Sequence, residues 1–385
     1  MPIQPRRGNV TWLRALLLVI LIAVVGGVFG LLYFGRAGQA KKKRPADEDA
    51  LKAEKGTTLI GQDFDYTYTQ GNRPVFRIRG ESIRADKENT IYLDKVGVTI
   101  YDQQARPFEV ESREAVFKRA TNEGLLRGSV RLKGPGDLQL RTDALDVLEQ
   151  GHTLVTRRPA EIGLGGTYLA WGQQLQVHLN QELFLLDGKT SVTTLDKTPD
   201  LSLHADRLVY ERQQRQLRAE GDVHFTRARD RIQAGRVAAF LAPDEKSLIF
   251  LRALWNVSGE AHAKSESQGS TVVRFRGDDL ALLMEPAGKQ ARREVRTVAL
   301  EGKPDKPGDK AELQTIGGGV TRILLARRIE GHMAAGVLSG AEGFGGVEMR
   351  ETGPKGAVLR HAVGQRAQAG FRADGQVSSL SLQEN

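Results

Sequence analysis

Residues 217–241, "LRAEGDVHFTRARDRIQAGRVAAFL", alternate apolar and polar side chains over most of their length. Alternation with a period of two is typical of a β-strand that buries one face and exposes the other. The pattern breaks at a short charged stretch and resumes at Ile232 and Ala234, which predicts a second strand. The apolar side of the first strand consists of Leu217, Ala219, Gly221, Val223 and Phe225.

The same alternation begins soon after residue 57. It is clear in "DFDYTYTQ" (63–70), "VFRIRG" (75–80) and "KVGVTIYD" (95–102). Segments with a helical period are few, and Ala281–Met284 is predicted as no more than a turn. The sequence therefore predicts an all-β fold. The apolar residues that share a face within the first two segments are Phe64, Tyr66 and Tyr68, and then Phe76 and Ile78.

Several alternating units carry a glycine near the middle. These glycines are Gly128, Gly188, Gly221 and Gly259, and the last three follow one another at intervals of 33 and 38 residues. Degenerate units of this length predict strands stacked into a long sheet or solenoid, each burying its face against its neighbours. A glycine inside a strand predicts a bend or bulge where such a sheet folds over.

Loops are marked by proline, glycine and alternating charge. The clearest is "GKPDKPGDKAE" (302–312), and "PAGKQARRE" (286–294) is another. A weaker boundary signal lies at "LDKTPD" (195–200).

The N-terminal segment has a different composition. Residues 15–34, "ALLLVILIAVVGGVFGLLYF", contain no charge. At about 1.5 Å per residue they would span roughly 30 Å, the thickness of a bilayer core. The apolar region of a cleaved signal peptide is shorter, about 7–15 residues. The sequence predicts an uncleaved single-pass anchor in 1–35 and a polar linker in 36–57. Basic residues flank both sides of the anchor, so charge alone leaves its orientation open.

Charge and composition exclude several classes of function. The net charge is +9, and eight basic residues without any acid lie in residues 1–44, so the rest is nearly neutral. A nucleic-acid binder would carry its basic face on the folded part. The chain contains no cysteine, and its seven histidines lack metal-ligand spacing. With no catalytic motif either, we expect no enzyme, no metal, no cofactor and no nucleic-acid partner.

The apolar face of the predicted sheet is the remaining candidate site. It could be an ordinary core. Alternatively, a sheet folded on itself but left open along one side would form an apolar trough, in which an acyl chain of about a dozen carbons gains on the order of 10 kcal/mol gross. The candidate groove residues are Val98, Ile100, Leu126, Val130, Leu138, Leu140, Leu186, Val192, Leu217, Val223, Phe225 and Ile232.

A family resemblance links these features. The anchor, followed by "FRIRGESIRADKENTIYLDKVGVTIYD" (76–102), "LLRGSVRL" (125–132) and "LFLLDGKTSV" (183–192), resembles the LptC family of lipopolysaccharide export. The segment that begins "LSLHADRLVYERQQRQLRAEGDVHFTRARDRIQAG" (201–235) resembles the related OstA-like protein LptA. The resemblance implies an LptC-like open β-jellyroll in 58–195 and an LptA/OstA-like jellyroll extension in 196–385.

The resemblance also implies function and partners. It implies an inner-membrane protein whose C-terminal domain lies in the periplasm. Such a protein accepts lipopolysaccharide from the membrane subunits of an ABC transporter and passes it to an LptA-like jellyroll. The strand edge near Phe64, Tyr66, Tyr68, Phe76 and Ile78 would contact the transporter. The chain is longer than typical LptC proteins, so whether its second half replaces a separate LptA stays open. The alternative is a membrane-tethered β-solenoid scaffold that binds only proteins.

Overall fold

The computed structural model describes residues 59–86, 90–195, 201–245, 247–264, 270–286, 293–303, 308–334, 337–371 and 377–383. The chain divides into two compact units, 1–56 and 57–385, and the fold described here is that of the second. The predicted anchor and linker lie outside the described residues. Among the residues that are described, none forms a helix with the length and hydropathy that a membrane span requires.

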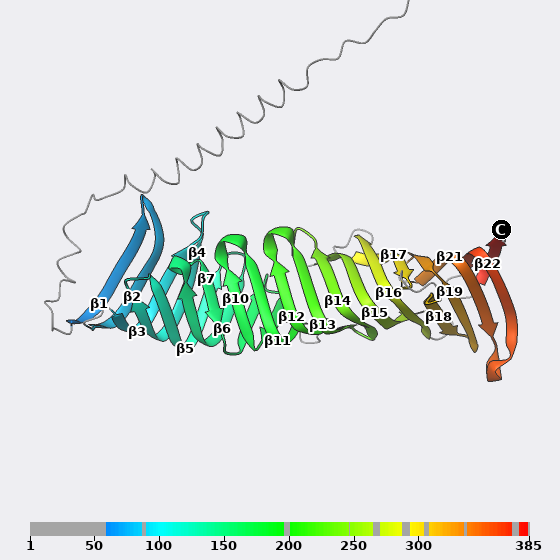
Figure 1. Cartoon of the computed structure of the whole chain (residues 1–385), viewed down its shortest axis with the longest axis horizontal. Coiled ribbons are helices and arrows are strands. Elements are labelled where there is room, and N and C mark those ends of the chain that lie inside the picture. Colours follow the sequence, from blue (N-terminus) through cyan, green and yellow to red (C-terminus); the bar gives the residue numbers. More distant parts are fainter. Residues whose placement is uncertain are drawn as a thin grey trace, which may run out of the picture. The chain divides into compact units, whose positions relative to one another are not determined.

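The second unit is one antiparallel sheet, as the alternation predicts (Figure 1). Its first strands are β1 (Leu59–Gln70), β2 (Arg73–Ala85), β3 (Thr90–Tyr101), β4 (Pro107–Lys118), β5 (Glu123–Gly134), β6 (Leu138–Leu148), β7 (Thr153–Thr156), β8 (Ala160–Leu164), β9 (Tyr168–Gly172), β10 (Gln174–His178), β11 (Leu183–Thr194) and β12 (Leu201–Glu211).

The sheet continues through the second half of the chain. Its strands there are β13 (Gln216–Arg227), β14 (Asp230–Leu241), β15 (Leu248–Lys264), β16 (Ser270–Pro286), β17 (Arg293–Glu301), β18 (Ala311–Gly317), β19 (Val320–Ala326), β20 (Arg328–Ala334), β21 (Val337–Thr352), β22 (Val358–Phe371) and β23 (Val377–Gln383).

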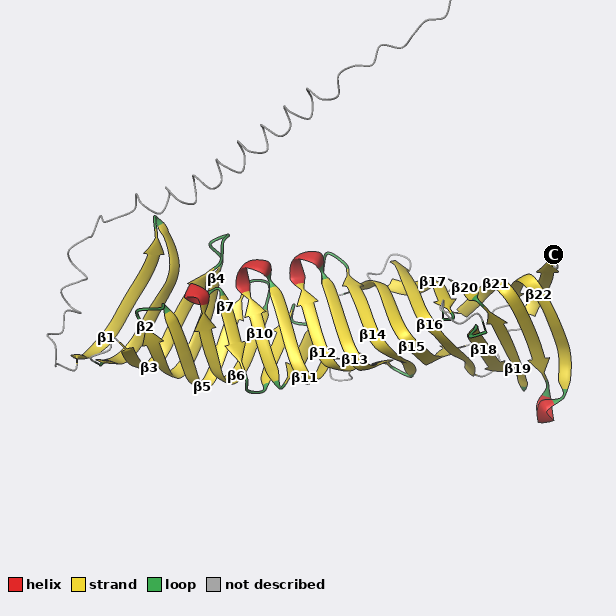
Figure 2. Cartoon of the chain, viewed as in Figure 1, coloured by secondary structure: helices red, strands yellow, loops and turns green. Residues whose placement is uncertain are grey.

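Helical structure in the described residues is limited to four short 3₁₀ turns (Figure 2). They are η1 (Glu149–Gly151), η2 (Leu179–Gln181), η3 (Arg212–Gln214) and η4 (Pro354–Gly356). The turn predicted at Ala281–Met284 is wrong, because these residues continue β16. The alternation of that strand outweighs the local helical spacing.

Long strands bend at their middle, and three of the four predicted glycines lie at the bends. Gly128, Gly188 and Gly221 have φ values of +78°, +79° and +78°, and the residue after each is also left-handed. The strand registers shift at the same places. Glycine adopts a positive φ without the steric cost that a side chain imposes, which explains its position there.

The fourth predicted bend is wrong. Strand β15 bends at Trp255 and Asn256, whose φ values are +68° and +55°. Gly259 does not take a left-handed conformation. A Cβ atom there would overlap the Phe275 ring and the Arg231 carbonyl oxygen, so this glycine permits a close approach between neighbouring strands.

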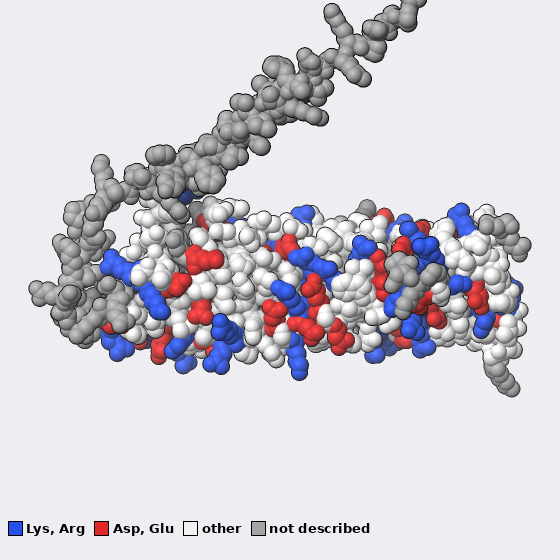
Figure 3. Space-filling model, viewed as in Figure 1, with Lys and Arg blue, Asp and Glu red and all other residues white. Residues whose placement is uncertain are grey.

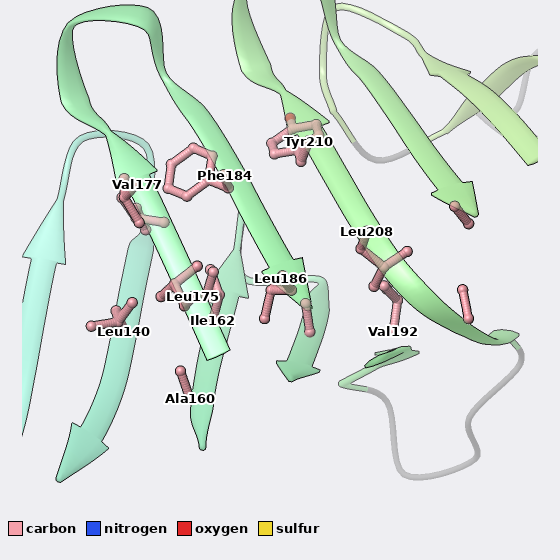
Figure 4. Packing of buried hydrophobic residues seen from close by; sticks show 14 of the residues in the cluster. Leu140, Ala160, Ile162, Leu175, Val177, Phe184, Leu186, Val192, Leu208 and Tyr210 are labelled. Carbon is pink, nitrogen blue, oxygen red and sulfur yellow. The ribbon is translucent and has the colours of Figure 1, made fainter. Parts of the chain in front are cut away.

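The bends fold the sheet into two facing layers. In β11, for example, Leu186 lies before the bend and Val192 lies after it, and both side chains border one internal cavity. Figure 4 shows such side chains converging from several strands. The interior is therefore the space between two halves of the same sheet.

The predicted internal boundary does not interrupt the sheet. Residues 196–200 lie outside the described residues, but β11 and β12 pair directly along nearly their whole length. In the predicted 302–312 loop, residues 302–303 and 308–310 are irregular, whereas Ala311 and Glu312 already belong to β18. The division into two jellyroll domains stays a prediction.

Candidate lipid-binding interior

The predicted groove residues all face the interior between the two layers. Ten of the twelve are buried, and Leu217 and Phe225 are partly buried against the same core. The fully enclosed members include Ile100, Val130 and Val223. The alternation therefore identified the inward face correctly, although burial alone does not separate a lipid site from a core.

An apolar cavity lies between the two layers in the middle of the chain. It has a volume of about 80 Å³ and is bordered by strands β8, β9 and β11–β15. Phe184 and Tyr210 stack at one side of it, with ring centroids 6.0 Å apart. Its wall is entirely aliphatic or aromatic: Ile162, Leu164, Tyr168, Ala170, Phe184, Leu186, Val192, Leu201, Leu203, Leu208, Tyr210, Leu217, Ala219, Phe225, Val237, Ala239, Leu241, Leu248 and Leu251.

This cavity is small for a hydrocarbon chain. An apolar cavity of about 150 Å³ holds one benzene molecule, whereas the central cavity measures about 80 Å³. A second cavity, beside Phe76 and Ile100, measures about 30 Å³. An acyl chain of a dozen carbons therefore fits only if the two layers move apart. The expectation of an interior wide enough for such a chain does not hold for this conformation.

The C-terminal part of the interior is built differently. Its cavity of about 30 Å³ includes Thr315 and Arg322 in the wall. Arg322 lies 3.4 Å from Glu351 of the neighbouring strand, and both side chains are largely buried. The rest of the wall is apolar, with large side chains such as Leu324 and Met349 beside alanines. Its buried alanines are Ala311, Ala326, Ala341, Ala367 and Ala369.

The side opposite the bends was expected to be open, but turns from the two layers meet across it at two places. We call this line of contact the seam. At the first place, which we call the first clasp, the β3–β4 turn (102–106) contacts η2 and Glu182. Arg106 bridges the Asp102 and Glu182 carboxylates, and the Gln103 backbone N–H donates to Asn180 Oδ1 over 3.2 Å.

At the second place, the second clasp, the β5–β6 turn contacts η3. Arg212 Nη1 donates to the carbonyl oxygen of Pro135 over 2.8 Å, and Arg212 Nε pairs with Glu245 over 3.1 Å. A Cβ atom at Gly136 would overlap the Arg212 guanidinium. A side chain at this position would therefore displace the Arg212 guanidinium, and the φ of +66° also favours glycine.

Sequence reasoning missed the clasps. The hydrogen bonds that cross the seam join residues 76 or 77 positions apart, at both clasps. The polar residues involved lie in turns, where a sequence gives no reason to distinguish them from solvated loops. Only the register of seven intervening strands brings them together.

The two ends of the described sheet are strand edges. Strand β1 pairs only with β2, so its other edge is free within the described residues. Phe64, Tyr66 and Tyr68 of β1 are partly buried. The Phe64 and Tyr66 rings stack, and the Tyr68 ring stacks on Phe76 with centroids 5.2 Å apart. Phe76 and Ile78 lie on β2 and are buried. Of the predicted contact edge, only the β1 residues stand on the edge strand itself.

At the other end, β23 covers only the second half of β22. The first half carries three exposed apolar side chains, Val358, Leu359 and Val363. On the outer surface seen in Figure 3, acidic and basic side chains are interspersed. Within the described ranges, no cluster of histidine and carboxylate side chains could hold a metal ion.

Comparison with known families gives one match. The family model described as "Lipopolysaccharide-assembly, LptC-related" matches residues 18–169. This part of the chain is LptC-related. The match confirms the resemblance seen in the sequence and includes residues 18–35 of the predicted anchor. Comparison with curated proteins returns no match.

Among solved structures, the chain is similar to LptH from Pseudomonas aeruginosa. That protein is described as the LptA homologous periplasmic component of the lipopolysaccharide transport device. The similarity covers 30% of this chain and 83% of LptH, at 16% identity and a TM-score of 0.27.

Proposed function

We propose that the chain is an envelope protein that carries lipopolysaccharide, with the acyl chains between the two layers and the sugars outside. The support is the family match over residues 18–169 together with an interior whose central part is entirely apolar. A folded sheet whose two end strands leave edges unpaired among the described residues could receive a lipid at one end and release it at the other. No group in such a path has to react.

The location and partners are part of the same proposal. An anchor in residues 15–34 would hold the jellyroll at the inner membrane, with the sheet in the periplasm. The free edge of β1 would meet the membrane subunits of an ABC transporter. The half-covered β22 would add a strand from an LptA-like protein, because an unpaired edge offers backbone groups to a partner strand.

Site-specific photo-crosslinking in cells with active export tests this proposal. A benzophenone side chain at Leu140 or Val223 points into the interior and is expected to capture lipopolysaccharide. The same side chain at Arg141 or His224, one residue along the same strands, points outward and serves as the matched control.

Capture at the inward positions alone supports carriage between the layers. Capture at neither pair of positions, in protein that is folded and expressed, would leave the scaffold alternative in place. The close packing of the interior is the observation that favours that alternative.

A further inference from the structure

We propose that the seam is a gate, and that the clasps centred on Arg106 and Arg212 hold it closed until an acyl chain enters sideways between the layers. This inference rests on the proposed carriage of lipid. Entry only through the ends would not require the seam to open. Sideways entry leaves a charged headgroup in water throughout, which avoids the large cost of burying it.

The first clasp is held in place by a buried carboxylate with several hydrogen-bond partners. Asp102 has only 2% of its side chain exposed. Its carboxylate accepts hydrogen bonds from the backbone N–H groups of Gln104 and Arg106, at 2.9 and 2.8 Å, and from Arg106 Nε at 2.7 Å. These bonds fix the turn and aim the guanidinium across the seam at Glu182. Buried ionic groups of this kind need such a full set of partners.

The second clasp connects the seam to the central cavity. Tyr210 borders the cavity with its ring. Burial and then the neighbouring Glu245 carboxylate, to which it is hydrogen-bonded, raise the pKa of the Tyr210 hydroxyl. Glu245 in turn pairs with Arg212. A chain of contacts therefore leads from the cavity wall to the residue that bridges the two layers.

The chemistry of the closure suits a reversible gate. The cross-seam contacts at both clasps are hydrogen bonds and ion pairs at the rim, where water can replace each partner on opening. Arg106 and Glu182 keep 34% and 13% of their side chains exposed, so water can reach both charges once they separate. The apolar interior beneath the seam is instead the part that a hydrocarbon can solvate.

A disulfide across the seam tests the gate directly. The chain has no cysteine, so Gln103→Cys with Asn180→Cys creates a single disulfide at the first clasp. The matched control is His204→Cys with His224→Cys, a directly opposed pair within one layer. Each pair is introduced into the full chain that carries the benzophenone at Val223, purified in detergent, and exposed to purified lipopolysaccharide.

We expect the oxidised seam variant to lose about tenfold or more of its initial rate of lipopolysaccharide capture, and to regain it on reduction. The control pair should capture lipid at the same rate in both states. Equal capture by the oxidised and reduced seam variant overturns the gate and leaves lipid carriage intact. No capture by the reduced protein or by the control overturns the proposed function itself.

A variant that weakens the second clasp should change the rate of lipopolysaccharide capture in the opposite direction to the seam disulfide. Arg212→Ala removes the contacts to Pro135 and Glu245. We expect faster capture than in the parent chain, whereas a purely structural role for Arg212 would leave the rate unchanged or lower it.

Discussion

The central and C-terminal parts of the interior share one fold but differ in what fills them. Between strands β8 and β15 the facing side chains are large and apolar, as in Leu186, Leu208 and Tyr210, and a cavity of about 80 Å³ remains. From β18 to β23 large apolar side chains such as Leu324 and Met349 also face the interior, but the cavity there measures only about 30 Å³ and has Arg322, paired with Glu351, in its wall.

This difference shows that the shape of a folded sheet does not by itself create a lipid path. Large flexible side chains can move aside and leave an apolar wall for a hydrocarbon. In the C-terminal part, a buried ion pair penalises a hydrocarbon that separates the two charges. We infer that acyl chains are held mainly in the central part.

Truncation of a large central side chain should have the greatest effect. Leu208 is buried and borders the central cavity. Leu208→Ala is expected to lower the free energy of unfolding by about 2–5 kcal/mol, because the lost apolar contacts add to the cost of an enlarged cavity. Urea denaturation measures the loss. A loss below 1 kcal/mol would mean that this interior is already loose.

Enlarging a small buried side chain in the C-terminal part should lower the free energy of unfolding by less. Ala341 is buried beside a cavity of only about 30 Å³. Ala341→Leu is expected to lower the free energy of unfolding by about 1–3 kcal/mol through overpacking. A stabilised variant, measured in the same urea titration, would remove the contrast between the two parts.

The bends allow a comparison at equal backbone geometry. Gly221 and Gly345 both have φ of +78°. An added Cβ at Gly221 would overlap the Asp206 carboxylate and lie 2.9 Å from Asp206 Cβ, whereas at Gly345 its nearest neighbour is Arg327 Cβ at 3.0 Å. Gly221→Ala is expected to cost about 1–3 kcal/mol, with Gly345→Ala at the lower end of that range. Thermal unfolding of both variants checks the order.

Gly97→Ala is the control for these two variants. Gly97 lies in β3 without a positive φ, and an added Cβ meets nothing within 4 Å. Its free energy of unfolding should change by no more than about 0.5 kcal/mol. A loss equal to that of Gly221→Ala would show that the bends are not special.

An outer-face charge pair should give the smallest effect, since it is independent of the interior. Arg274 hydrogen-bonds to Glu260 over 2.9 Å, and this bond lowers the pKa of the Glu260 carboxyl below its ordinary 4.5. The stabilisation is therefore present above the ordinary pKa and is lost as the pH falls through the lowered one. Glu260→Gln should slightly reduce the drop in melting temperature between about pH 6 and pH 3. A larger drop in melting temperature in the variant than in the parent chain would contradict this expectation.

The sequence predicted what depends on local pattern. Alternation identified the strands and their inward faces, and glycine identified the bends at 128, 188 and 221, because left-handed backbone strongly favours it. The bend at Trp255 escaped prediction because it uses residues that rarely adopt that conformation. The bend predicted at Gly259 was wrong because a glycine can also be needed where two neighbouring strands approach each other closely.

The candidate site was predicted only in part. The twelve groove residues do face the interior, but the distance between layers depends on packing across the whole sheet. The seam contacts, such as Arg212 with Pro135, depend on the register of seven strands between them. A turn residue gives no local sign of such a long-range partner.

The separation of the two layers tests the central claim most directly. Spin labels at His204→Cys and Arg252→Cys lie on exposed positions of opposite layers, and the chain offers no other cysteine. Double electron–electron resonance on the full chain then measures the distance between the two spin labels with and without lipopolysaccharide. The account predicts a longer distance when lipopolysaccharide is bound. An unchanged distance at saturating lipopolysaccharide would contradict it.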